Sequence, residues 1–303
     1  MKQPFFVAAA ILFFSSIAKL GYAQEKLKEG HLQYAISIED KVLKKYMDNI
    51  KQGKGKPMEA MKNAANGMSP AEIDYLKKIT KDNPEMGLSL ILLPYLGNSI
   101  NLKGEKTLGE CKAITYELQN LWDQTENKGV NYIESTVDPS NNLSFTYDKS
   151  YKVDDPMTIG ANNFDKVETS EHVKVLDFDT HKTVYKRKSS TSHKVPYKLE
   201  VYTTPFISNA VNFSHPYYSD EKDGIVKINA YLTEGAAPMV YQLVKYDKNK
   251  VTAAELTPKT STKQYSTKTE TDKVTLGFNV LGIMLNTGGE GSSGTKEDDD
   301  NED

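Results

Sequence analysis

The side chains that most often do chemistry in proteins are few and scattered in this chain. Its five histidines stand at 31, 172, 181, 193 and 215, and none belongs to a His-Glu-x-x-His motif. Glu171-His172 and the run from Asp177 to His181 hold metal-ligand types, but such groups on a polar strand face are typically just solvated. The spacing therefore predicts no metal site.

Nucleophilic chemistry finds no support in the sequence either. Cys111 is the only cysteine, and no histidine stands near it to activate the thiol, so we expect a buried, small apolar residue. The chain has no Gly-x-Ser-x-Gly motif and no glycine-rich phosphate loop. Catalytic groups need only meet in space, so a hydrolase stays as a third hypothesis. The prediction is a protein that is not an enzyme and needs no cofactor.

Flexible apolar side chains are the more promising candidates for a binding site. Five of the nine methionines lie between Met47 and Met86, and the stretch 86–96 that follows is apolar almost throughout. Methionine adapts to irregular partners, so this region either lines a pocket for an apolar ligand or fills gaps in a packed core. The candidate ligand-binding residues are Met47, Met58, Met61, Leu90, Leu92 and Trp122.

The elements that position these residues are mainly strands. Apolar and polar residues alternate from His172 to Thr257, with short polar turns between the runs, which predicts an antiparallel meander. Further strands are expected over 31–38, 130–137 and 143–147, a loop over 148–170, and a last strand over 273–286. The expected fold class is mainly β (α+β): a curved antiparallel sheet or incomplete β-barrel.

A helical insertion is predicted at about 40–84, because its apolar residues recur at helical spacing. Asp40 can cap the first helix, and Gly67 can end a short middle one. Ser69-Pro70-Ala71-Glu72 is a capping box with proline at the first helical position. We expect the insertion to pack on the open face of the sheet.

Both ends of the chain differ from its body. Residues 1–23 have the layout of a secretory signal peptide, and 288–303 form a polar, acidic tail that is expected to be disordered. A single domain is left over 24–287, with no transmembrane anchor expected after cleavage. The formal net charge of -3 and the lack of a nucleic-acid motif argue against a nucleic-acid partner.

Two short motifs carry a resemblance to known proteins. The first strand opens as Gly30-His31-Leu32-Gln33-Tyr34-Ala35-Ile36, and a late run reads Gly235-Ala236-Ala237-Pro238-Met239-Val240-Tyr241. With the signal peptide and the meander, these runs resemble exported families of unknown function related to the LolA and LolB lipoprotein carriers. The resemblance implies an incomplete barrel whose mouth is plugged by helices above an apolar cavity, and it implies no catalytic residues.

Two functions are expected from these features. The first is a periplasmic or secreted, non-catalytic binding protein for an apolar small molecule, a lipid or a lipoprotein. The second is a structural or protein-interaction module of the cell envelope, with a fully packed core and a protein partner bound on its tyrosine- and lysine-bearing outer face.

Overall fold

The structure is a computed structural model, which describes residues 25–52, 57–82, 92–153, 163–189, 196–214 and 219–285. The predicted signal peptide and acidic tail lie outside these described residues, and so does most of the apolar stretch 86–96.

The described chain forms one twelve-stranded sheet, which confirms the mainly β fold class. The order across the sheet is β12-β6-β5-β4-β3-β2-β1-β11-β10-β9-β8-β7. Neighbouring strands are antiparallel except β12, which runs parallel to β6, and the sheet is not closed into a barrel. The strands are β1 (Glu29–Ile38), β2 (Gly97–Lys103), β3 (Lys106–Lys112), β4 (Tyr116–Asp123), β5 (Lys128–Ser135), β6 (Asn142–Tyr147), β7 (Phe164–Val175), β8 (Phe178–Arg187), β9 (Lys198–Thr204), β10 (Gly224–Tyr231), β11 (Met239–Tyr246) and β12 (Gln264–Tyr265).

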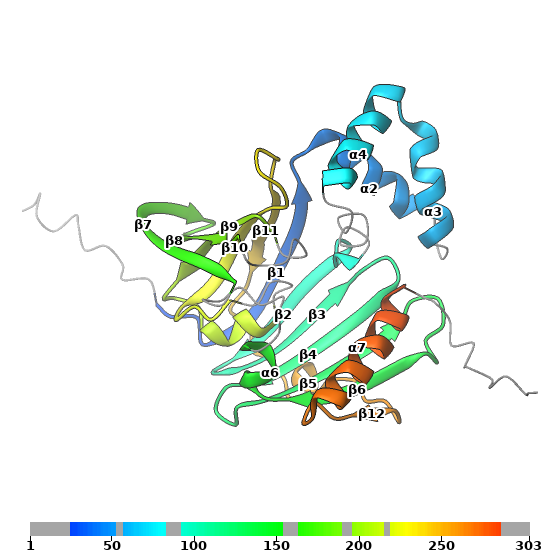
Figure 1. Ribbon diagram of the computed structural model, residues 1–303. Helices are drawn as coiled ribbons and strands as arrows, with labels where there is room; N and C mark the ends of the chain where they lie inside the picture. Colours follow the sequence, from blue (N-terminus) through cyan, green and yellow to red (C-terminus); the bar gives the residue numbers. More distant parts are fainter. Residues whose placement is uncertain are drawn as a thin grey trace, which may run out of the picture.

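The sheet is strongly bent, with the half β2–β6 inclined to the half β7–β11 and β1 between them (Figure 1). The 3₁₀ segment η2 (Asn209–Ser214) lies on the inner face, where it contacts β3, β4 and β10. Gly109 on β3 makes this approach possible, because a Cβ there would lie 2.5 Å from Cβ of Ser214. We call the side that holds η2 the inner face and the opposite side the outer face.

The predicted helical insertion is present as α2 (Lys41–Gln52), α3 (Pro57–Ala64), the 3₁₀ turn η1 (Ala65–Gly67) and α4 (Pro70–Asp82). Asp40 caps α2 by accepting hydrogen bonds from the backbone of Val42 and Leu43, both at 2.9 Å. Ser69 and Glu72 form the capping box of α4. The helices pack beyond one end of β1 (Figure 1), in a hydrophobic cluster that includes Ile38 and Met239.

The predicted last strand over 273–286 is wrong, because this segment is the helix α7 (Glu270–Leu285). The apolar residues of this segment fit the two-residue period of a strand and also the 3.6-residue period of a helix. On the helix, Leu276 and Ile283 fall on one face, and both are buried against β4–β6. A capping box distinguishes the helix from the strand: the Thr269 N–H donates to the Asp272 carboxylate, and the Asp272 N–H donates to the Thr269 hydroxyl.

Two boundaries in the middle of the chain also differ from the prediction. The meander ends with β11, and 251–257 continues as a loop with the 3₁₀ turn η3 (Ala254–Leu256), which crosses the outer face. The predicted loop over 148–170 contains the short helix α6 (Lys149–Val153) and the start of β7. Charged residues fill both strand and loop here, so composition does not separate them.

The inner face beside η2 and α7 holds an aromatic stack. Trp122 on β4 packs against Phe213 of η2 with ring centroids 3.7 Å apart, and against Tyr147 of β6 at 5.8 Å. Gly129 on β5 leaves the space for Tyr147, because a Cβ at Gly129 would lie 2.1 Å from its ring. The sheet therefore depends on a missing side chain at this position.

We expect Gly129→Ala to lower the free energy of unfolding by about 1–3 kcal/mol, because the added methyl must displace the Tyr147 ring. Gly97→Ala on β2 is the matched control, since its Cβ would meet no atom closer than 4.0 Å. Urea unfolding monitored by circular dichroism measures both. Equal stability of the two variants would contradict the packing described.

Candidate binding sites on the outer face

Of the six predicted ligand-binding residues, the three whose side chains the structure describes lie in two separate hydrophobic clusters. Met47 is fully buried in the cluster between helices and sheet, whereas Trp122 and Leu92 belong to the cluster beneath α7. The side chains of Met58 and Met61 and all of Leu90 lie outside the described residues. Met47 and Trp122 thus belong to two different packed clusters.

A groove of about 380 Å³ lies on the outer face of the sheet. It runs over β1, β2, β3 and β11, and we call it the His31 groove. Alternation along β1 places His31 and Gln33 outward, opposite Asn101 and Ser99 of β2. The volume lies within the range of small-ligand sites, about 300–1,000 Å³.

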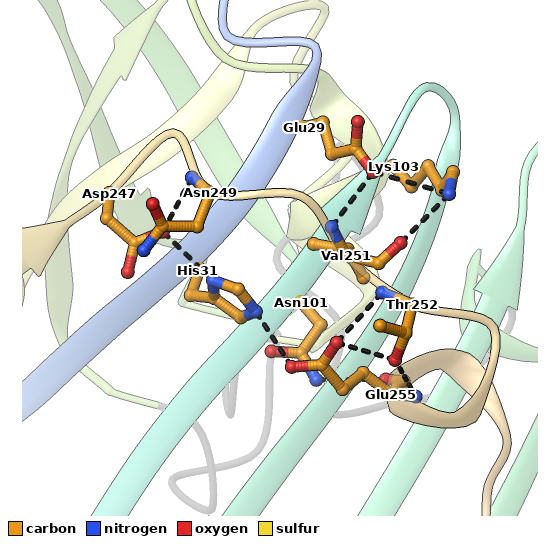
Figure 2. A network of polar contacts seen from close by, with 9 residues as sticks. All are labelled: Glu29, His31, Asn101, Lys103, Asp247, Asn249, Val251, Thr252 and Glu255. Carbon is orange, nitrogen blue, oxygen red and sulfur yellow. Dashed lines mark hydrogen bonds and ion pairs between the residues drawn. The ribbon is translucent and has the colours of Figure 1, made fainter.

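His31 is held between two carboxylates, as Figure 2 shows. Its Nδ1 lies 2.9 Å from Oδ1 of Asp247, and its Nε2 lies 3.0 Å from Oε1 of Glu255. A neutral imidazole has only one N–H, so donating to both acids requires the protonated ring. The geometry therefore favours an imidazolium at this position.

Both acids belong to the segment 247–257, which we call the strap because it crosses the outer face over β1–β3 (Figure 2). Lys103 donates to the backbone carbonyl of Val251 at 2.8 Å, and the backbone N–H of Val251 donates to the Glu29 carboxylate at 2.9 Å. Val251 and Leu256 pack on Leu108 of β3. Polar bonds on both sides of a small apolar contact thus fix the strap and one wall of the groove.

The pKa shifts follow from these contacts. Hydrogen bonding to Asp247, and then to Glu255, raises the pKa of His31 above its ordinary value despite partial desolvation. The bond from His31 lowers the pKa of Asp247. The Thr252 hydroxyl and backbone, followed by His31, lower the pKa of Glu255 to about 2. All three groups are therefore charged across a broad window of acidic pH.

We expect His31→Gln to destabilise the protein in a pH-dependent way. A raised folded-state pKa gives stability that is fully present below the unfolded value of about 6.5 and is lost as pH rises through the folded value. The loss of melting temperature in the variant should therefore be larger near about pH 6 than near about pH 9, in thermal unfolding followed by circular dichroism.

His181→Gln is the control for this experiment, since His181 packs on His172 and has no ion pair among the described residues.

Asp247 and Glu255 have the opposite pH dependence to His31. Their pKa values are lowered in the folded protein, so the stability that they contribute is lost as pH falls below their ordinary values. A His31→Gln deficit that is equal at both pH values would contradict the ionic clamp.

A second outer-face site lies over β8, β9 and β10. The register aligns Lys186, Lys198 and Tyr231 across the three strands, beside a pocket of about 340 Å³ that also reaches Tyr197. The Lys198 ammonium lies 3.9 Å from the ring centroid of Tyr231, and that of Lys186 lies 5.7 Å from the ring of Tyr197. We call these four residues the lysine–tyrosine surface.

Glu200 organises this surface from β9. It accepts hydrogen bonds from Asn229 at 3.0 Å, Tyr231 at 3.1 Å and Lys198 at 2.9 Å. Burial alone would raise the pKa of Glu200, but these bonds lower it below the ordinary value. Burial and the Glu200 carboxylate raise the pKa of Tyr231 to about 12, so its hydroxyl stays protonated. Hydrogen bonds to Glu200 thus hold Lys198 and Tyr231 in place on this surface.

The His31 groove was missed in the sequence because its partners are remote. His31 and Glu255 are separated by 224 positions, and nothing in the spacing of a single histidine points to two acids. The segment 251–257, which contains Glu255, was expected to be part of the meander and not a loop crossing the sheet. The lysine–tyrosine surface agrees better with expectation, since an outer face bearing tyrosine and lysine was predicted from strand alternation.

Cys111 lies half-buried on β3, among partly buried residues packed against the cluster beneath α7. Desolvation raises the pKa of its thiol to about 12. A thiol with so high a pKa is largely protonated at neutral pH and is a poor nucleophile. Among the described residues, no group of three or more histidine, cysteine or acidic side chains is placed to hold a metal ion.

Comparison with known proteins identifies no family. No family model matches the chain, and no curated protein matches it. Among solved structures, PNGF-II aligns at 10% identity and a TM-score of 0.35, over 59% of this chain and 30% of that one. An uncharacterized conserved protein from Thermus thermophilus aligns at 9% identity and a TM-score of 0.27, over 56% of this chain and 83% of that one.

Similarity at this level assigns neither fold nor function, and the chain spans under a third of the PNGF-II chain. The resemblance to exported families related to the LolA and LolB carriers therefore stays a prediction. Within the part of the chain that the structure describes, none of the helices combines the length and apolarity needed to cross a bilayer.

Proposed function

We propose that the protein is a non-catalytic interaction module of the cell envelope, which binds a protein partner on its outer face. One observation carries the proposal: the inner face, where a carrier of apolar ligands would hold its cargo, is occupied by η2 and α7. Trp122, Phe213, Leu276 and Ile283 are all buried there in one cluster.

The outer face carries two hollows whose side chains are suited to binding a protein partner. The His31 groove, over β1–β3 and β11, and the pocket at the lysine–tyrosine surface, over β8–β10, both lie on it. Tyrosine is favoured at protein interfaces because its ring supplies contact area and its hydroxyl a hydrogen bond. The side chains at both sites are already held by ion pairs and hydrogen bonds, which reduces the entropy lost on binding.

The envelope location rests on the predicted signal peptide, and the non-catalytic role rests on the sequence, in which we recognise no catalytic motif. The alternative, a carrier of an apolar ligand between helices and sheet, needs a cavity beside Met47. Met47 instead has no exposed surface and packs with Leu43, Ile50 and Ala64.

A packed core and a cavity wall respond differently to truncation. We expect Met47→Ala to cost about 2–5 kcal/mol of unfolding free energy, as in a well-packed core. Leu96→Ala, at a residue that is 53% exposed, should change stability by less than about 0.5 kcal/mol. Chemical unfolding measures both variants. A near-neutral Met47→Ala variant, together with uptake of an apolar fluorescent probe by the wild type, would favour the carrier instead.

The partner surface can be mapped in cells. A photo-reactive phenylalanine analogue at Gln33 or Tyr231 should give a discrete cross-linked product, because both positions lie on the proposed interface. The same analogue at Lys77, whose side chain on α4 is 72% exposed, should give none. Immunoblotting after irradiation reads the result. Cross-links from Lys77 alone would place the interface on the helices and refute the proposal.

A further inference from the structure

Two histidines that are separated in the sequence lie side by side in the hairpin of β7 and β8, at the edge of the sheet (Figure 1). The register places His172 directly opposite His181. Their ring centroids are 4.7 Å apart, and the ring planes meet at 67°. Opposite side chains of an antiparallel pair lie on the same face with Cβ atoms about 4.5–5.5 Å apart, so the strands themselves keep the two imidazoles adjacent.

Hydrogen bonds fix the backbone on both sides of this pair. The Thr180 hydroxyl donates to the carbonyl of Val173 at 2.6 Å, on the side of the turn. On the other side, the Thr169 hydroxyl donates to the carbonyl of Lys182 at 3.0 Å, across the bulge that precedes His172. The strands therefore supply a fixed support, and rotation of the side chains alone sets where the ring nitrogens point.

The ring nitrogens of both histidines are available for a ligand. Both residues are exposed, and neither imidazole has a hydrogen bond or an ion pair among the described residues. His31 differs, because carboxylates occupy both of its nitrogens. A neutral imidazole has one nitrogen with a free lone pair, and this nitrogen is the atom that binds metal ions. The pair thus offers two nitrogen ligands from adjacent strands.

The separation of the rings suits one metal ion bound between them. Zinc lies about 2.0–2.1 Å from a histidine nitrogen, and the ring centre lies about 1.1 Å behind that nitrogen. Two imidazoles on one ion, at an angle of about 90–110°, therefore have ring centroids about 4.5–5.2 Å apart. The separation of 4.7 Å falls within this range. Rotation of the exposed rings would bring a nitrogen of each to the ion without movement of the strands.

The charges of the hairpin favour a cation at this position. Between positions 168 and 182 the chain has four acidic residues and two lysines. Within the part of the chain that the structure describes, no third histidine, cysteine or carboxylate completes a group with the pair, so water would fill the other positions of the ion. Imidazole suits copper, zinc and nickel, whereas magnesium and calcium prefer oxygen ligands, and copper(II) is bound most tightly of the divalent series.

We propose that His172 and His181 bind one divalent transition-metal ion, copper(II) more tightly than zinc. The sequence did not reveal this site, because the spacing of the two histidines matches no metal-binding motif and only the turn at Leu176 and Asp177 brings them together. The site shares no residue with the His31 groove or the lysine–tyrosine surface. It is therefore independent of the proposed partner interface.

Electron paramagnetic resonance tests the two ligands directly. The full-length mature protein, without a histidine tag, is titrated with copper(II) chloride. We expect one tightly bound ion per chain, with a spectrum that shows coupling to two nitrogens. His172→Gln and His181→Gln should each weaken this binding by at least about tenfold, because even the loss of a group behind a metal ligand costs about 10–100-fold in affinity. Zinc chloride in excess should displace the copper, and magnesium chloride should not.

Val167→Ala is the matched control, since Val167 lies on β7, is 58% exposed and has no ligand atom in its side chain. This variant should bind copper as the wild type does, and circular dichroism checks that every variant is folded. Copper binding that survives both histidine substitutions would place the ion elsewhere, for example on the acidic tail. That result, or a wild type that binds no copper in a one-to-one ratio, overturns the proposal.

Discussion

The structure depends on filling the concave side of a bent sheet from within the chain. A sheet with this bend leaves apolar side chains of both halves facing a space that strands alone cannot fill. Here η2 and α7 fill it, and Trp122 ties η2 to β4 through its stack on Phe213. Gly109 on β3 leaves the space that Ser214 of η2 occupies, and Gly129 on β5 leaves the space for the Tyr147 ring, which packs against Trp122.

Polar groups make the same contact specific. Asn120 on β4 donates to the carbonyl of Phe213 at 2.6 Å and accepts the Tyr147 hydroxyl. Buried groups of this kind cost free energy unless they are paired, so only one placement of η2 satisfies them. Apolar packing supplies the stability of the inner face, while these bonds select its arrangement.

The sequence predicted what depends on local pattern and missed what depends on distant partners. The capped helices after Asp40 and Ser69 and the alternating strands were recognisable, because caps and periods are local signals. The segment 270–285 was ambiguous, since its apolar residues suit both periods and only the Thr269–Asp272 box distinguishes them. The clamp on His31 was beyond prediction, because its acids arrive from a segment more than 200 positions away.

The two faces of the sheet therefore have different roles for physical reasons. On the inner face the described side chains pack against one another, apart from the small polar cavity beside Trp122. On the outer face charges are held in place but stay hydrated, as with His31 under the strap and Glu200 among its three donors. Such groups have already lost much of their rotamer freedom in the free protein. A partner that meets them loses less entropy on binding than it would on a mobile surface, and this favours recognition on the outer face.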